Sequence, residues 1–402
     1  MNRSPLTTLL SALLPALATV ALAASELPTF SGPTPGTRRD MTLPLVDISG
    51  ERQRHSIVAR GTPEVYHGHC DTVLLPDGKT MFTAWTVDHA RLVGPLARST
   101  DGGRTWSAPL EVPANWHQTA NTPAIHRLVD PQGMARLIVF ADGLDWRRGG
   151  KAPYPMHQAI SEDDGRTWTP MKPNGIEGEV PPKTIHAFDG GRRLILWTDL
   201  PGLVVQCESH DGGLTWTPGR KILRIPGRWG QPAVVRSPDG RQLLMLLREN
   251  NRQHNSLYST SDDEGRTWRE PRELPAALTG DRHVMRYVSG GRLLVAMRDM
   301  AKTSPTYGHY VAWVGRYEDI VEGREGQYRV KLLNNAARTD ADAPGQGNTD
   351  CGYSDLEVFP DGTIVATTYI KYAPGPEKNS VVNTRFMISE TDALWQKVAP
   401  RR

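Results

Sequence analysis

The sequence predicts an all-β protein, a six-bladed β-propeller, and two repeated patterns carry this prediction. The first pattern, Ser-x-Asp-x-Gly-x-Thr-Trp, occurs four times, with its starts separated by 62, 48 and 52 residues. These intervals suit a four-stranded blade and exceed the common 34-residue helical repeat. The second pattern, two short apolar strands joined by a turn that contains Gly, occurs six times. Six such hairpins predict six blades.

The first pattern has the composition of a tight turn. Ser and Asp side chains can bond the backbone, Gly permits a positive φ, and Trp supplies a large apolar ring that fits between neighbouring sheets. We therefore expect a structural role for the four copies, with their tryptophans largely buried. The copies start at Ser99, Ser161, Ser209 and Ser261 and end at Trp106, Trp168, Trp216 and Trp268.

The second pattern sets the order of the blades. Its six units span residues 70–86, 121–141, 185–199, 231–249, 282–300 and 352–370. The last two blades lack the first pattern: residues 309–317 and 327–333 complete the fifth, and residues 380–386 give the sixth its third strand. We expect residues 54–60 to supply the missing fourth strand, because this closes the ring without leaving an exposed edge. The propeller then spans residues 46–402.

The start of the chain predicts export. Residues 1–23 contain Arg3, an apolar stretch and a final Ala-Leu-Ala, the order expected of a secretory signal peptide. Residues 24–45 are rich in Pro, Ser and Thr and predict a linker. The formal charge of +3 over 402 residues gives no support to nucleic-acid binding. We expect a monomer, secreted or periplasmic, that is not attached to a membrane after signal cleavage.

Cysteine usage leaves two alternatives open. The chain has three cysteines, Cys70, Cys207 and Cys351, and an odd count is not a disulfide framework. Because Cys70 and Cys351 open the first and last units, a closed ring would place them side by side. They would then form either a closing disulfide or buried free thiols.

Strand alternation predicts where the functional site lies. If the first pattern forms the turns between third and fourth strands, the first strands start, and the second strands end, on the opposite face. These positions converge on the axis, and many of them are titratable, which favours a site there. They include His67, His69, Asp71, Asp88, His89, Asn121, Trp229, Gln231, Arg248, Glu249, Arg282, His283, Arg298, Tyr353, Asp355 and Lys371.

Together the six units and four turns resemble the sialidase superfamily of glycoside hydrolases, as a divergent member, over roughly residues 50 to 390. In that family the turn pattern is called the Asp box or BNR repeat. Residues 352–364, Gly-Tyr-Ser-Asp-Leu-Glu-Val-Phe-Pro-Asp-Gly-Thr-Ile, are similar to the segment that carries the family's catalytic tyrosine. This implies Tyr353 as nucleophile. A phenol needs a nearby base, and Asp355, two residues along the strand, or Glu249 could supply it.

The resemblance also implies a carboxylate clamp of three arginines. Arg248 and Arg298, each closing a second strand, match two of them, unless they are structural partners of Glu249 and Asp299. Gly68 occupies the position of the first arginine, so we expect sialic acid itself to be a poor substrate. Asp88 matches the loop of the family's acid/base aspartate. Gln231 stands where the family has a glutamate.

We therefore expect a secreted, exo-acting glycoside hydrolase of sialidase type that acts on an acidic or heavily hydroxylated terminal sugar of a glycan or oligosaccharide. His67, His69, Arg282, His283 and Lys371 are further candidates for substrate contact. Two histidines separated by one residue are a weak metal signal, and we expect no metal and no cofactor. Two alternatives stay open: a lyase of uronic-acid polysaccharides, and a carbohydrate-binding propeller without catalysis.

Overall fold

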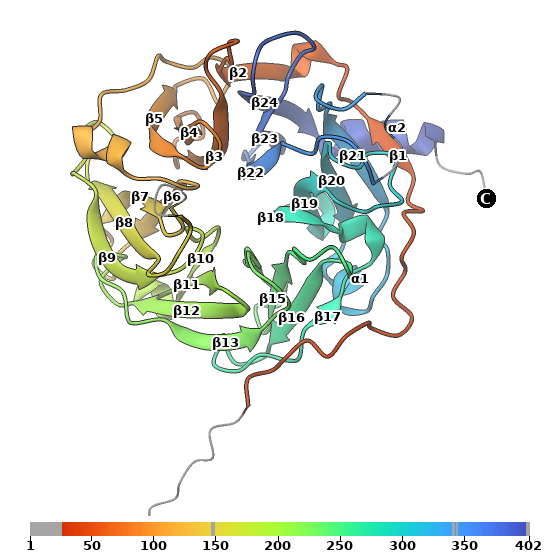
Figure 1. The fold of residues 1–402 in the computed structure, drawn as a ribbon, viewed down its shortest axis with the longest axis horizontal. Coiled ribbons are helices and arrows are strands. Elements are labelled where there is room, and N and C mark those ends of the chain that lie inside the picture. Colours follow the sequence, from red (N-terminus) through yellow and green to blue (C-terminus); the bar gives the residue numbers. More distant parts are fainter. Residues whose placement is uncertain (1–25, 146–148, 340–341, 343–344, 399–402) are drawn as a thin grey trace, which may run out of the picture.

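Six β-sheets stand around a central axis in the computed structural model (Figure 1). It describes residues 26–145, 149–339, 342 and 345–398, so the predicted signal peptide lies outside the described residues. The six-bladed ring confirms the predicted fold class. In each blade the first strand lies innermost, and successive strands pair antiparallel toward the outside.

The bounds of the elements follow the predicted units. The first three sheets contain β3 (His67–Leu74), β4 (Met81–Val87) and β5 (Leu92–Ser99); β6 (Ala124–Val129), β7 (Ala135–Asp142), β8 (Pro155–Ser161) and β9 (Lys172–Glu177); and β10 (Ile185–Phe188), β11 (Arg193–Leu200), β12 (Leu203–Ser209) and β13 (Arg220–Arg224). The fourth contains β14 (Ala233–Arg236), β15 (Leu243–Leu247), β16 (Leu257–Ser261) and β17 (Arg272–Glu273).

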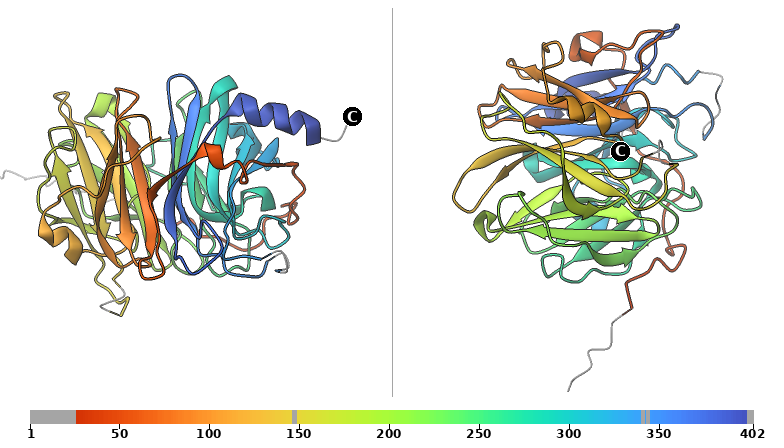
Figure 2. Two further views of the ribbon diagram at one scale, coloured as in Figure 1. Left: turned by 90° about the horizontal axis from the view of Figure 1, so that it is seen from above. Right: turned by 60° about the vertical axis from the view of Figure 1, so that its left-hand side comes forward.

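The last two sheets combine segments from both ends of the chain. The fifth contains β18 (Gly280–Val288), β19 (Arg292–Asp299), β20 (Tyr310–Gly315), β21 (Tyr328–Leu333) and β1 (Leu45–Asp47). The sixth contains β22 (Gly352–Val358), β23 (Thr363–Ile370), β24 (Ser380–Met387) and β2 (His55–Ala59). The helices α1 (Tyr317–Val321) and α2 (Ile388–Val398) lie outside the sheets, and α2 is seen at the edge of the ring in the side view (Figure 2).

The ring closes where the sequence predicts, because β2 pairs antiparallel with β24. The prediction of four strands in every blade is wrong for two of the sheets. The fifth sheet gains β1, which pairs parallel with β21. The first sheet has three strands, and the segment after its turn bonds β5 through the N–H groups of Ser107 and Leu110 and through the Ser107 hydroxyl, which accepts the N–H of Arg98. Pro109 and Pro113 lack a backbone donor, which explains why this segment is not a regular strand.

The four Asp turns repeat one set of hydrogen bonds. In each, the Ser hydroxyl donates to the Asp carboxylate at 2.8 Å, and the Thr hydroxyl donates to the other carboxylate oxygen at 2.6 Å. Each turn follows a third strand, as predicted. Trp216 and Trp268 are buried, with 8% and 5% of their surface exposed.

The prediction that all four tryptophans are largely buried is wrong for two of them, because Trp106 and Trp168 are only partly buried. Each Asp turn packs on the preceding blade: Gly103 approaches Asn383, and Gly165 approaches Phe82. Both partly buried rings therefore flank the first sheet, where the missing fourth strand leaves less sheet surface to cover them.

The described part of the predicted linker is bound along the outside of the ring. Thr29 bridges to Arg224, and Arg39 forms an ion pair with Glu273 at 2.5 Å. All three cysteines are buried free thiols, which decides against a closing disulfide. Among the described residues, no helix has the length and apolar character needed to cross a membrane.

Candidate active site

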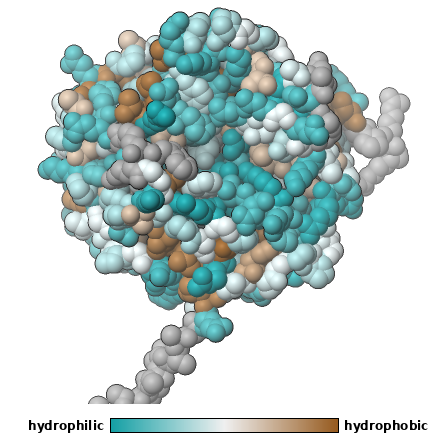
Figure 3. Space-filling model, in the orientation of Figure 1, coloured by the Kyte–Doolittle hydropathy of each residue, from teal (hydrophilic) through white to brown (hydrophobic). Residues whose placement is uncertain are grey.

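A pocket of about 490 Å³ opens on the axis, on the face opposite the Asp turns. All six blades or the loops before them contribute to it, and hydrophilic residues surround the hollow at the centre of the ring (Figure 3). The lining residues are His69, His89, Ala90, Asn121, Thr122, Leu144, Val180, Trp229, Arg248, Arg298, Asn348, Thr349, Asp350 and Tyr353.

Distortions of the inner strands aim side chains at this pocket. The register of β22 shifts between Gly352 and Asp355, and β3 shifts in the same way between Gly68 and Asp71. Such bulges break strand alternation and re-aim a side chain, and a positive φ in a residue other than Gly is uncommon. Equivalent rim positions share this conformation: His69 (φ 26°), Asn121 (69°), Gln231 (46°), Arg282 (51°) and Tyr353 (51°).

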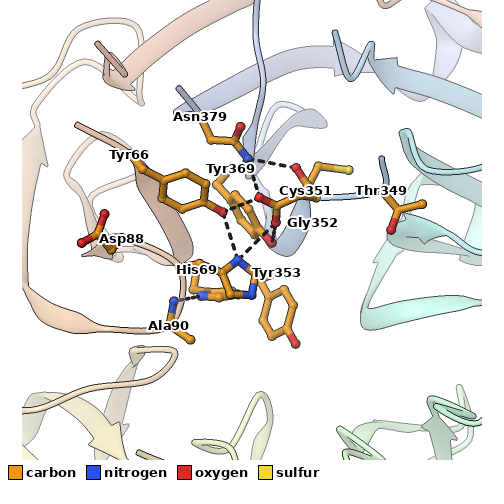
Figure 4. Close-up of polar contacts among 12 residues, drawn as sticks. Tyr66, His69, Asp88, Ala90, Thr349, Cys351, Gly352, Tyr353, Tyr369 and Asn379 are labelled. Carbon is orange, nitrogen blue, oxygen red and sulfur yellow. Dashed lines mark hydrogen bonds and ion pairs between the residues drawn. The ribbon is translucent and has the colours of Figure 1, made fainter. Parts of the chain in front are cut away.

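Tyr353 lies in the pocket wall, at the start of β22. Its hydroxyl oxygen accepts hydrogen bonds from the Gln231 side-chain amide at 2.6 Å and from Arg248 Nη1 at 3.3 Å. Its ring meets the His69 ring edge-on, with centroids 4.3 Å apart (Figure 4). The implied nucleophile is thus placed at the pocket, and its partners are two nitrogen donors.

The bases suggested for Tyr353 are not its neighbours. Asp355 is buried below the pocket, where it forms ion pairs with Lys183 at 3.2 Å and Arg286 at 3.3 Å. The bulge between residues 352 and 355 explains the error, because alternation no longer places Tyr353 and Asp355 on one side. The lining of the pocket does not include Asp355.

Glu249 also has a structural role. Its carboxylate accepts the backbone N–H groups of Asn251 at 3.1 Å and Gln253 at 3.0 Å and so fixes the loop after β15. Asp88 is exposed, does not line the pocket and lies apart from the polar contacts drawn in Figure 4. The prediction that Glu249 and Asp88 are catalytic is therefore not supported by their positions.

The two predicted arginines do meet at the pocket, and a buried carboxylate joins them. Asp281 lies 3.0 Å from Arg248 Nε and 2.8 Å from Arg252 Nη2, and it also pairs with Arg298. Burial alone would raise the pKa of Asp281, but the three guanidinium groups outweigh it and hold this pKa far below its ordinary value. Asp281, rather than Glu249 or Asp299, is thus the structural partner of the arginines.

Arg248 and Arg298 differ in the hydrogen-bond donors they have left for a ligand. Arg298 Nη1 donates to the carbonyls of Thr349 and Cys351, each at 3.0 Å, while its Nε and Nη2 donate to Asp281. A guanidinium has five N–H donors, so little of Arg298 remains. Arg248 Nη1 contacts Tyr353, and its Nη2 has no partner among the described contacts. Arg248 is the better candidate for binding an anion.

Histidines 67 and 69 lie in different surroundings. His69 Nδ1 accepts the backbone N–H of Ala90 at 2.9 Å, and burial lowers the pKa of its imidazole well below the ordinary value. It is therefore neutral, with its proton on Nε2. His67 accepts the Trp85 indole N–H at 2.9 Å and lies outside the pocket lining.

Three further candidates do not line the pocket. Arg282 is buried beneath Tyr353, its guanidinium carbon 5.7 Å from the ring centroid, and donates to the Pro181 carbonyl at 3.0 Å. His283 is buried and donates to the Leu278 carbonyl at 2.9 Å. Lys371 donates to the carbonyls of residues 375 and 377 and so fixes its own loop.

Sequence reasoning missed Asp350, which precedes β22. Its carboxylate accepts hydrogen bonds from the hydroxyls of Tyr66 at 3.0 Å and Tyr369 at 2.9 Å, and it lies 3.2 Å from His89 Nδ1. Figure 4 shows Tyr66, Tyr369 and Asn379 turned toward one point. The segment 348–350 follows the fifth blade and belongs to neither repeat, so no pattern marked it. In the described part of the chain, no cluster of His, Cys, Asp and Glu could hold a metal ion.

Known proteins share this architecture. Residues 49–226 match the family model described as the BNR repeat-like domain. A protein of unknown function from Dyadobacter fermentans is similar over 83% of this chain and 98% of its own, with 15% identity and a TM-score of 0.61. The NanB sialidase from Streptococcus pneumoniae is similar over 84% and 71%, with 13% identity and a TM-score of 0.57.

The Hadza microbial sialidase Hz136 is similar over 84% of this chain and 69% of its own, with 16% identity and a TM-score of 0.56. A search of the curated proteins found no match. At these identities the likeness concerns the fold, and the expected resemblance to the sialidase propeller is confirmed at that level.

Proposed function

We propose that this chain is a secreted or periplasmic glycoside hydrolase that removes an acidic terminal sugar, with Tyr353 as its reactive group. The observation that supports this most is the environment of the Tyr353 hydroxyl. Gln231 and Arg248 both donate to its oxygen. The phenolic proton therefore remains available to a ligand, and both donors stabilise the phenolate that its loss creates. A stabilised phenolate can attack an anomeric carbon.

The pocket suits a small acidic sugar. Its volume is typical of sites for small ligands, which favours the end of a glycan over a long internal segment. Arg248 offers unused donors for a carboxylate at the same wall as Tyr353. Trp229 lines the pocket as well and offers an apolar ring to a sugar.

Sialic acid is expected to be a poor substrate, because this pocket lacks two free members of the three-arginine clamp that the resemblance implies. A β-carbon at Gly68 would lie 2.5 Å from Cε1 of Tyr66, so the Tyr66 ring occupies the space that the missing arginine would need. Arg298 is already engaged, which leaves one guanidinium for the carboxylate. Hydrogen bonds to charged groups contribute about 1.5 to 3 kcal/mol each, so the loss of two clamp residues weakens binding by at least tenfold.

A uronic-acid lyase is the second candidate, and Gln231 is the observation in its favour. An amide cannot accept the proton of Tyr353, whereas the resemblance implies a glutamate at this position. In an elimination, Arg248 would neutralise the sugar carboxylate, a base would remove the proton beside it, and Tyr353 would give its proton to the leaving oxygen. That scheme requires no carboxylate beside the phenol.

An assay of the secreted chain separates these functions. Substrates are 4-methylumbelliferyl glycosides of sialic acid, glucuronic acid and galactose, and a polyuronate. We expect umbelliferone release from the glucuronide and at least tenfold slower release from the sialoside. Appearance of near-ultraviolet absorbance from the polyuronate, without release of aglycone, would establish the lyase instead. Glycan binding without either product would establish the non-catalytic alternative and overturn an enzyme.

A matched pair of arginine variants tests recognition of the acidic group. Arg248→Gln should raise KM for the glucuronide by about 10- to 100-fold and leave KM for the galactoside unchanged, because only the glucuronide loses a charge-assisted contact to its carboxylate. The kcat should fall on both glycosides, because Arg248 also donates to the Tyr353 hydroxyl. Arg241→Gln is the control, since the Arg241 side chain is 88% exposed and lies outside the pocket. An equal rise in KM for both glycosides would contradict a carboxylate contact.

A further inference from the structure

We propose that His89 is the proton-transfer residue of this pocket and that Asp350 positions it. This inference rests on the proposed enzymatic function. It assigns the acid/base role to the residue that follows Asp88 in the loop after β4, and the partner carboxylate comes from the loop before β22. Both His89 and Asp350 line the pocket, at the wall that also carries Tyr353.

The loop that carries His89 is anchored on both sides of it. The Asp88 N–H donates to the carbonyl of Tyr66 at 3.0 Å, and the Ala90 N–H donates to His69 Nδ1 at 2.9 Å. The carbonyl of Ala90 accepts the N–H of Asn121 at 3.2 Å, which ties the loop to the next blade. His89 itself is exposed to solvent, but its backbone is fixed at the pocket wall.

Asp350 is held as an ionised carboxylate. Tyr369 donates to Oδ1 at 2.9 Å, and Tyr66 donates to Oδ2 at 3.0 Å, with the Asn379 amide at 3.4 Å. Burial raises the pKa of Asp350, but the contact with His89 and the hydrogen bond from Tyr369 outweigh it and lower this pKa to about 2. A group with that pKa binds no proton near neutral pH, so Asp350 does not itself transfer protons.

An ionised carboxylate fixes the tautomer of the neighbouring imidazole. Because Asp350 can only accept, the 3.2 Å contact with His89 Nδ1 requires the proton on Nδ1. Tyr66, also 3.2 Å from Nδ1, uses its own proton toward Asp350 and so accepts rather than donates there. This leaves the lone pair of His89 Nε2 free for the pocket, the arrangement that a general base requires.

His69 has the opposite tautomer and cannot take this role. Its Nδ1 already accepts the Ala90 N–H, so its Nε2 carries the proton and has no lone pair to offer. The two imidazoles meet edge-on, with centroids 4.5 Å apart. Neighbouring histidines thus present one donor and one acceptor to the pocket.

The hydrolytic cycle balances with these groups. The phenolic proton of Tyr353 passes to His89 Nε2, and the phenolate forms a bond to the anomeric carbon. The bond to the leaving oxygen breaks as that oxygen takes the proton from His89. In the second half, His89 takes a proton from water, whose oxygen replaces Tyr353 on the anomeric carbon. The proton then returns from His89 to the phenolate.

Tautomer states measured by ¹⁵N NMR test the positioning step without any substrate. In the ¹⁵N-histidine-labelled chain at alkaline pH, where imidazoles are neutral, His89 should show a protonated Nδ1 and an unprotonated Nε2. His69 should show the reverse and serves as the internal control. Asp350→Asn should convert His89 to a mixture of tautomers and leave His69 unchanged. A wild-type His89 protonated at Nε2 would overturn the role of Asp350 whatever the protein hydrolyses.

The choice of leaving group tests the proton transfer itself. The 4-nitrophenolate of a 4-nitrophenyl uronide leaves without protonation, whereas the leaving sugar of a uronosyl disaccharide requires a proton on its oxygen. His89→Gln should lower kcat/KM for both substrates, because His89 also takes the proton of Tyr353, but the loss on the disaccharide should be at least about tenfold larger, with partial rescue by free imidazole. Asp88→Asn, the neighbouring exposed residue, is the matched control. Equal losses on both substrates, or none, would overturn the role of His89.

Discussion

The two faces of the ring use aspartate differently. On one face, Asp101, Asp163, Asp211 and Asp263 sit in four turns with the same hydrogen bonds at nearly the same distances. On the other, Asp281 holds three arginines, and Asp350 holds two tyrosines and a histidine. Repetition from blade to blade marks residues that build the fold. Departure from the repeat marks residues that the pocket uses.

Removing one carboxylate from each face should give the largest difference in stability. Asp281→Ala leaves three buried or half-buried guanidinium groups uncompensated, and loss of one partner of a buried ion pair costs about 3 to 5 kcal/mol. Asp263→Ala removes hydrogen bonds in a partly exposed turn, where each contributes about 1 kcal/mol. Urea denaturation of both variants measures the two costs. Equal losses would contradict the contrast between the faces.

The tryptophans of the Asp turns should divide into two classes. Trp216→Ala and Trp268→Ala should each destabilise by about 3 to 5 kcal/mol, because both rings are buried between complete sheets. Trp106→Ala and Trp168→Ala should cost about half as much, since their rings flank the three-stranded sheet and are partly exposed. Melting temperatures of the four variants rank them. A uniform cost would show that the first sheet covers its neighbours as fully as the others do.

Acid should weaken the turn face gradually. Burial raises the pKa of Asp101, but the bonds from Thr105 and Ser99 outweigh it and lower the pKa to about 2, against an ordinary 3.8. Between these values the unfolded chain binds more protons than the folded one, so this stabilisation is complete above pH 4 and is lost as the pH falls toward 2. Unfolding curves of Asp101→Asn should depend less on pH in this window than those of the wild type. Parallel curves would contradict the assignment.

Asp88→Asn should have the smallest effect. The side chain is exposed and does not line the pocket, so kcat/KM should change by less than about twofold. Steady-state kinetics on the substrate identified in the glycoside assay provides the measurement. A large loss would restore the acid/base aspartate that the family resemblance implies and would remove the case for His89.

The ring could be predicted from the sequence because the patterns that indicate it recur from blade to blade. Six hairpins, four Asp turns and the closing strand near residues 54–60 each follow from local patterns, and the structure contains them all. The site was predicted only in part. Tyr353, Arg248, Arg298 and His69 line the pocket as expected.

The errors at the site have a common physical cause. Strand alternation placed Asp355 beside Tyr353, but a bulge at residues 352–355 breaks the alternation. The same kind of bulge aims His69, while the non-repeating loop before β22 carries Asp350. A prediction from the alternation of side chains along a strand does not anticipate a bulge. A loop outside the repeat has no counterpart in the other blades from which its position could be inferred.

The central claim is that Tyr353 performs chemistry in this pocket, and kinetics of Tyr353→Phe test it most directly. The substitution keeps the ring and its contact with His69 and removes only the hydroxyl. We expect the melting temperature and the KM for the glucuronide to stay close to wild type while kcat falls by at least about 100-fold. Tyr372→Phe, whose hydroxyl contacts His55 outside the pocket, is the control. A kcat of Tyr353→Phe equal to that of the wild type would contradict the account.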